Sequence, residues 1–147
     1  MIEKSEVNEW LRIAFVYSRK DKRLSAVTKY MMDFCEKAGC SVKAVEVESV
    51  TSPINFRPFD LVLVGAQVVS TFGGQISQEV VNFLNSVTGM EGKRSIAYVL
   101  PSLFGTDKAL KRLMACMERL GAFVVDFEVV RGEREARNLI SRHVRSG

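Results

Sequence analysis

The sequence lacks any long hydrophobic run, since no segment approaches the roughly 20 consecutive apolar residues that a membrane-spanning helix needs. The beginning of the chain, residues 1–6, is charged and lacks the apolar centre of a signal peptide. Internal repeats and low-complexity segments are absent as well. We therefore expect a soluble protein of the cytoplasm, with no membrane partner.

Cysteine and histidine are scarce, which argues against metal and disulfide sites. The three cysteines, Cys35, Cys40 and Cys116, are odd in number and form no close Cys-x-x-Cys pair. Cys35 and Cys116 fall on helical patterns, where we expect them to be buried as small apolar residues. The single histidine, His143, is expected on the solvent side of the last helix. No metal site is predicted.

The sequence also lacks a catalytic arrangement of side chains. Ser18, Ser70 and Ser102 follow predicted strands, but none lies in a Gly-x-Ser-x-Gly turn. No pair of carboxylates can be assigned to acid–base chemistry. We therefore predict no catalytic residue, and any redox chemistry would have to be carried by a cofactor.

What the chain does contain is typical of one globular domain. It has 147 residues, of which 47% are hydrophobic and 26% charged. We predict a single domain over residues 1–147, with residues 1–10 as an N-terminal extension. The net charge of +4 is mildly basic. It favours an acidic or phosphate-bearing partner, and it is too small to predict binding to nucleic acid.

Apolar runs of strand length alternate with segments of helical period along the whole chain. Strands are predicted at 11–17, 41–47, 60–65, 95–100 and 122–130, and helical faces at 24–38, 76–87, 107–120 and 136–144. The alternating pattern of 41–47 indicates an edge strand, whereas 60–65 is apolar on both faces. This order predicts an α/β protein with a parallel sheet covered by helices on both faces.

Three loops follow the carboxyl ends of predicted strands, where such sheets bind their ligands. They are the first loop at 18–23, the second loop at 66–75 and the third loop at 101–106. The first loop contains Arg19, Lys20, Lys22 and Arg23 just before a helix. Cations at a helix start are unfavourable by roughly 0.3–1 kcal/mol each, and a bound anion such as phosphate would reverse that effect. The alternative is that these side chains are solvated and Asp21 caps the helix.

Around these loops the sequence resembles the flavodoxins, over residues 12 to about 130. The resemblance is carried by segment 59–69, followed by Phe72-Gly73, and by segment 93–99, followed by Phe104-Gly105. It implies a flavodoxin-like, three-layer, doubly wound fold whose five parallel strands are ordered 2-1-3-4-5. The first loop departs from the family pattern, because it has no glycine where flavodoxins carry a Ser/Thr- and Gly-rich turn around the flavin phosphate.

The resemblance implies FMN as the cofactor and assigns residues of each loop to it. Phosphate would be held by Ser18, Arg19, Lys20 and Lys22. One side of the flavin ring would be flanked by Val69, Thr71, Phe72 and Gly73, and the other side by Ser102, Phe104 and Gly105.

Two functions remain open at this point. In the first, the chain is an FMN-binding electron-transfer protein or a small flavin-dependent oxidoreductase, with a redox protein as partner. In the second, the flavodoxin-like domain has lost FMN and binds phosphate, another anion or a protein. We expect either a monomer or a homodimer.

Overall fold

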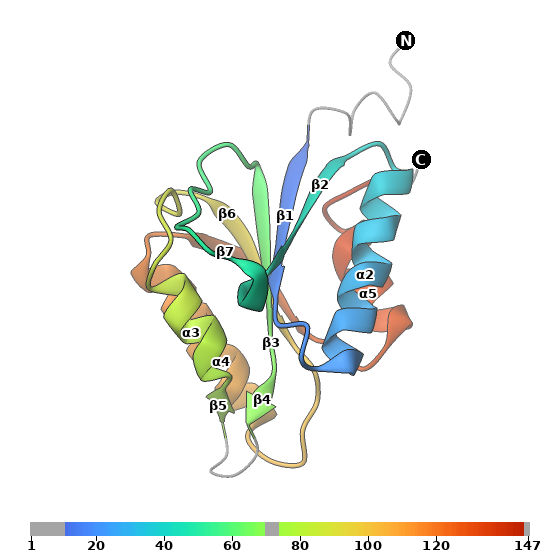
Figure 1. Cartoon of the computed structure of the whole chain (residues 1–147). Coiled ribbons are helices and arrows are strands. Elements are labelled where there is room, and N and C mark those ends of the chain that lie inside the picture. Colours follow the sequence, from blue (N-terminus) through green and yellow to red (C-terminus); the bar gives the residue numbers. More distant parts are fainter. Residues whose placement is uncertain (1–10, 70–73, 146–147) are drawn as a thin grey trace.

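The computed structural model describes residues 11–69 and 74–145. Its main sheet is built from five parallel strands in the order β2-β1-β3-β6-β7 (Figure 1). These strands are β1 (Arg12–Tyr17), β2 (Ser41–Glu46), β3 (Leu61–Ala66), β6 (Arg94–Val99) and β7 (Phe123–Val129). Numbered along the chain, this is the expected order 2-1-3-4-5, so the predicted fold class is confirmed. The proposed N-terminal extension, 1–10, lies outside the described residues.

Helices cover both faces of the sheet. The helices are α2 (Lys22–Lys37), α3 (Gln78–Leu84), α4 (Thr106–Arg119) and α5 (Glu133–Ser141), and a short 3-10 helix, η1 (Val47–Ser49), follows β2. Helices α2 and α5 lie on one face, and α3 and α4 lie on the other (Figure 1). Within the described residues, none of these helices combines the length and the apolar character that a membrane crossing requires.

A small hairpin lies in the second loop, which the sequence predicted as irregular. Strands β4 (Val68–Val69) and β5 (Gln75–Ile76) pair antiparallel to each other, outside the main sheet. Each is only two residues long, which is too short for a periodic pattern to be visible in the sequence.

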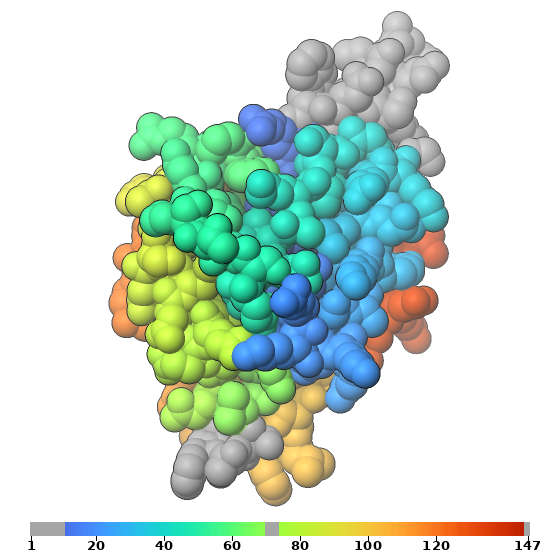
Figure 2. Space-filling model, viewed as in Figure 1, coloured from blue at the N-terminus to red at the C-terminus, as the bar shows by residue number. Residues whose placement is uncertain are grey.

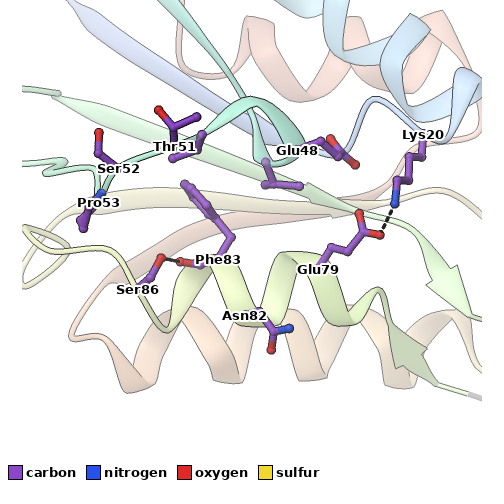
Figure 3. A pocket seen from close by; sticks show the side chains of 11 residues that line it. Lys20, Glu48, Thr51, Ser52, Pro53, Glu79, Asn82, Phe83 and Ser86 are labelled. Atoms are coloured by element: carbon purple, nitrogen blue, oxygen red, sulfur yellow. Dashed lines mark hydrogen bonds and ion pairs between the residues drawn. The ribbon is translucent and has the colours of Figure 1, made fainter.

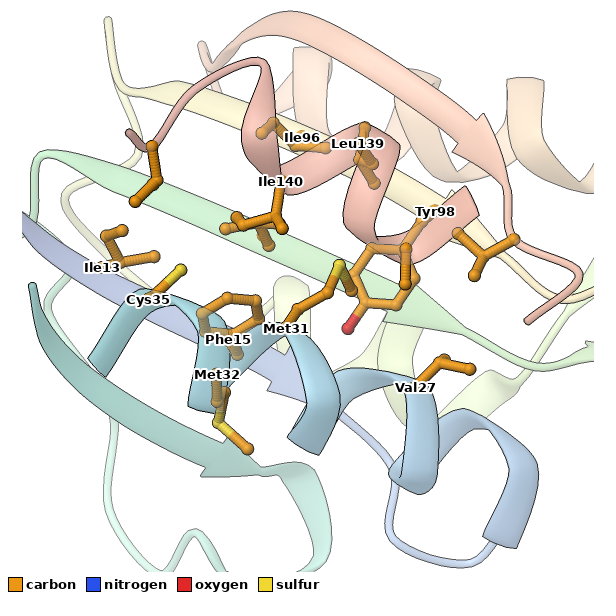
Figure 4. Packing of buried hydrophobic residues seen from close by; sticks show 14 of the residues in the cluster. Ile13, Phe15, Val27, Met31, Met32, Cys35, Ile96, Tyr98, Leu139 and Ile140 are labelled. Atoms are coloured by element: carbon orange, nitrogen blue, oxygen red, sulfur yellow. The ribbon is translucent and has the colours of Figure 1, made fainter. Parts of the chain in front are cut away.

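The three central strands β1, β3 and β6 are buried on both faces. Along β1, Ile13, Phe15 and Tyr17 belong to the core under α2 and α5, while Ala14 and Val16 belong to the core under α3 and α4. Figure 4 shows the first of these cores, with Met31 of α2 and Ile140 of α5 packed against the sheet. The outer strand β2 is mostly exposed or half-buried, as its alternating sequence predicted.

One polar contact is buried inside the first core. The hydroxyl groups of Thr28 on α2 and Tyr98 on β6 lie 2.6 Å apart and both residues are fully buried. The Tyr98 ring lies over Gly65 of β3, where an added Cβ atom would come within 2.4 Å of the ring. A glycine in β3 therefore makes room for a tyrosine in β6.

We predict that Tyr98→Phe destabilises the protein, because the Thr28 hydroxyl then loses its buried partner. The expected loss is about 1–3 kcal/mol in the free energy of unfolding, measured by urea denaturation. The double variant Tyr98→Phe with Thr28→Val should lose less than the sum of the two single losses. Tyr30→Phe, which removes a tyrosine hydroxyl from α2, the helix of Thr28, is the control. Additive losses in the double variant would contradict the prediction.

Cysteine and histidine partly differ from expectation. Cys35 is buried, as predicted, but Cys116 is only half-buried, and all three cysteines are free thiols. The prediction that His143 faces solvent is wrong, because its side chain is 12% exposed and its Nε2 lies 2.7 Å from Oδ2 of Asp126. Arg142 also binds Asp126, with Nε 2.8 Å from Oδ2. Residues at the end of α5 therefore anchor this helix to the edge strand β7.

The contacts of Asp126 make its contribution to stability depend on pH. Burial raises the pKa of Asp126, but hydrogen bonds from Arg142, His143 and the Phe127 N–H outweigh it, so the net pKa lies below the usual 3.8. Because the folded state lowers this pKa, its contribution to stability is complete above pH 3.8 and is lost as the pH falls through the folded value.

We therefore expect Asp126→Asn to lower the free energy of unfolding at pH 7 by about 1–3 kcal/mol. The difference from the unmodified protein should shrink as the pH falls from 3.8, where Asp126 of the unfolded chain takes up its proton, through the lower pKa of Asp126 in the folded protein. Urea unfolding at several pH values measures both effects. Asp33→Asn is the control, since Asp33 forms only an exposed pair with Lys37. An equal difference at pH 7 and at pH 2.5 would contradict this account.

Candidate functional site

The candidate site lies at the carboxyl edge of the sheet, between β1 and β3. These strands are neighbours and parallel, but β1 leads into α2 on one face and β3 leads on to α3 on the other. Such a switch point leaves a crevice in which doubly wound sheets bind ligands. The first loop, the described ends of the second loop and the third loop all lie at this edge (Figure 1). Figure 2 shows the first loop in blue, next to the teal segment that follows β2.

The donor groups of the first loop bind a carboxylate of the chain itself. Ser18 is buried, and its Oγ donates a hydrogen bond to Oε2 of Glu48 in η1. The backbone N–H of Arg19 donates to the other oxygen, Oε1, over 3.0 Å. Nη1 of Arg19 reaches Oγ of Ser49 at 3.2 Å. Two predicted phosphate residues, Ser18 and Arg19, thus meet at Glu48, which the sequence analysis did not single out.

These hydrogen bonds keep Glu48 ionised. Burial raises the pKa of Glu48, but the bonds from the Ser18 hydroxyl and the Arg19 N–H outweigh burial and leave the pKa below its usual value. The Glu48 carboxylate of η1 is therefore the anion that the first-loop donors Ser18 and Arg19 bind at neutral pH.

The other groups at the helix start are also paired within the chain. Asp21 caps α2, where its Oδ1 accepts hydrogen bonds from the N–H groups of Arg23 at 2.9 Å and Leu24 at 3.1 Å. Nζ of Lys20 lies 2.5 Å from Oε1 of Glu79 on α3. This hydrogen bond raises the pKa of Lys20. Of the predicted phosphate residues, only Lys22 projects from the helix start into solvent without a contact to these carboxylates.

A groove extends from the first loop along the outside of the sheet. It has a volume of about 690 Å³ and runs between segment 47–53 and α3. Figure 3 shows Lys20, Glu48 and Glu79 at one end of it, with the dashed line marking the pair between Lys20 and Glu79. Among the residues that the structure describes, the groove lining includes Lys20 of the first loop and no residue of the second or third loop.

The second and third loops lie against each other. A Cβ atom added at Gly74 would approach Cβ of Lys108, near the start of α4, to 2.5 Å. Gly74 and Gly105 both have positive φ, 89° and 72°, which favours glycine at each. Val69, at the end of β4, is 40% exposed. The predicted residues Thr71, Phe72 and Gly73 lie outside the described residues.

The third loop is held open by its own hydrogen bonds. The Ser102 N–H donates to Oγ1 of Thr106 at 3.0 Å, and Oγ of Ser102 donates to the carbonyl oxygen of Phe104 at 3.1 Å. Gly105 precedes α4 in the left-handed conformation. As a result, Leu103 and Phe104 point outward and are 89% and 68% exposed. Phe104 is therefore no part of the core, and it offers an apolar surface beside the sheet edge.

Comparison with solved structures identifies the architecture. This chain has a flavodoxin-like fold. The flavodoxin of Streptococcus pneumoniae TIGR4 is similar over 89% of this chain and 93% of that chain, at a TM-score of 0.69 and 15% sequence identity. Oxidised flavodoxin 1 of Bacillus cereus covers 89% and 92% at a TM-score of 0.66 and 12% identity. The flavodoxin of Fusobacterium nucleatum, whose structure contains flavin mononucleotide, is similar over 89% of this chain and 90% of that chain, at a TM-score of 0.60 and 14% sequence identity.

No protein-family profile matches the flavodoxin-like chain, and no curated protein sequence matches it significantly. The structural similarity therefore establishes the fold, and the ligand has to be argued from the edge of the sheet itself.

This edge fits the two parts of FMN unequally. Val69, Leu103 and Phe104 expose apolar surface, as the flat faces of a flavin ring require. The first loop does not fit a phosphate in the same way, because Ser18 Oγ and the Arg19 N–H already bind Glu48. The exposed apolar residues are of the kind that a flat ring requires, whereas the donors predicted to hold a phosphate bind a carboxylate of the chain.

Proposed function

We propose that this flavodoxin-like chain binds a flavin between its second and third loops and acts as an electron-transfer or small flavin-dependent redox protein. The observation that carries the proposal is the exposed apolar pair Leu103 and Phe104 in the third loop, held outward at the carboxyl edge of the sheet. FMN is the flavin found in the Fusobacterium nucleatum neighbour, and we propose an FMN-type ring as the cofactor here. The flavin, when bound, would supply the redox chemistry.

The residues of this chain would bind and shield the ring. Phe104 and Leu103 would pack on one side of it, with Val69 on the other, and their apolar surface would exclude water. The backbone of Gly105, free of a side chain, would allow close approach at the same place. We further propose a cytoplasmic location, which the three free cysteines support, and a redox protein as the partner.

The alternative function, a module that binds phosphate or another anion through the first loop, is not favoured. Such a module needs free donors and an unpaired positive charge. In the flavodoxin-like chain, Lys20 pairs with Glu79 and the Ser18 hydroxyl binds Glu48, so that Lys22 alone of the predicted phosphate residues has no contact with these carboxylates.

The proposal is tested by titrating the purified chain into FMN and into riboflavin while following flavin fluorescence. Quenching that saturates with either flavin is expected. Phe104→Ala should raise the dissociation constant by about three- to tenfold, because an aromatic contact with the ring is lost. Phe123→Ala is the control, because it removes a similarly exposed ring at the first residue of β7, on the edge of the sheet opposite the third loop. It should leave the dissociation constant unchanged. The proposal fails if neither flavin is quenched at high micromolar protein.

A further inference from the structure

The carboxylate of Glu48 makes the contacts that a ligand anion would make. One oxygen accepts from the Ser18 hydroxyl and the other from the Arg19 N–H, so both donors are used by a single charged group. Hydrogen bonds to an ionised acceptor are stronger than neutral ones. Glu48 lies 30 residues from Ser18 in the sequence, on η1, so this is a tertiary contact that joins the ends of β1 and β2.

The first loop has no second place for a phosphate. None of the non-glycine residues in segments 11–69 and 74–145 has a positive φ, so the loop at 18–21 cannot form the concave row of N–H groups that surrounds anions in other proteins. The N–H groups of Arg23 and Leu24 at the start of α2 are bound by Asp21. A phosphate could reach Ser18 and Arg19 only after Glu48 had left.

Displacing Glu48 would also be opposed by charge. A phosphate monoester carries about −1.5 to −2 charges at pH 7. Lys20 of the first loop is paired with Glu79, which lines the same groove as Glu48. A bound phosphate would therefore compete with one carboxylate and lie close to another.

We infer that Glu48 occupies the phosphate position of the flavin site, and that the flavin accepted by this chain is one without a phosphate group. This inference rests on the proposed function, because it concerns the same site. Riboflavin has the ring that suits Phe104 and Leu103, and its uncharged ribityl chain requires no anion position. Glu48 is thus a specificity-determining residue, which weakens binding of the phosphorylated form relative to the form without phosphate.

The test compares riboflavin with FMN in the unmodified chain and in two variants of Glu48. The unmodified chain should bind riboflavin at least as tightly as FMN. Glu48→Ala should lower the dissociation constant for FMN about tenfold or more, since two charge-assisted donors become free, and should leave that for riboflavin within about threefold. Glu48→Gln removes the charge but keeps an acceptor for Ser18, so its effect on FMN should be smaller and in the same direction.

Glu46→Ala is the matched control, because it removes the same charge two residues away without touching the contacts to Ser18 and Arg19. Circular dichroism establishes that each variant is folded before titration. Tighter binding of FMN than of riboflavin by the unmodified chain would overturn the inference and leave the proposed function standing. So would an FMN affinity that is the same in all three Glu48 forms. Absence of binding by both flavins would overturn the proposed function, and this inference with it.

Discussion

Burial of the central strands on both faces is the constraint on which the rest of this structure depends. Apart from the exposed Arg12 at the start of β1, strands β1 and β3 are buried on both faces, so their side chains are apolar and helices must cover both sides of the sheet. Right-handed connections to opposite faces then create a single switch point, between β1 and β3. The three loops are brought together by this geometry, whatever their own sequences are.

At that switch point, local charge decides what the common fold can bind. The first loop concentrates cations at the start of α2, where the helix dipole already makes the field positive. In this chain the compensating charges come from inside the molecule: Asp21 from the loop, Glu48 from η1 and Glu79 from α3. The third loop carries no such pairs and presents Leu103 and Phe104 to solvent. One edge of the sheet thus contains a charge-compensated part and an apolar part.

The sequence predicted the five strands of the main sheet because patterns over 6 or 7 residues are set by burial, which each strand experiences locally. The order of the strands was implied by the resemblance to flavodoxins. The sequence also pointed to the loops, since their place follows from the strand order. The partners of the loop residues were not predictable in this way. Glu48 and Glu79 lie 30 and 59 residues from Ser18 and Lys20, and no periodicity encodes such a contact.

A signal for one of them was nevertheless present. Glu48 lies two residues beyond β2, at the carboxyl end of a strand adjacent to β1, and the rule that drew attention to the three loops applies there as well. His143 was misplaced for a related reason. Its partner Asp126 lies on β7, and the sequence pattern of α5 alone places His143 only relative to its own helix.

The missing glycine and the presence of Glu48 are two aspects of one arrangement. A glycine in the first loop would permit left-handed backbone and therefore several converging N–H groups, enough for the three oxygens of a phosphate. Without it, the loop between β1 and the Asp21 cap directs Ser18 Oγ and the Arg19 N–H at one acceptor group. Two donors match the two oxygens of a carboxylate. Because Glu48 of η1 supplies this carboxylate, the chain satisfies both donors itself, and an anion from outside would have to compete with Glu48 for them.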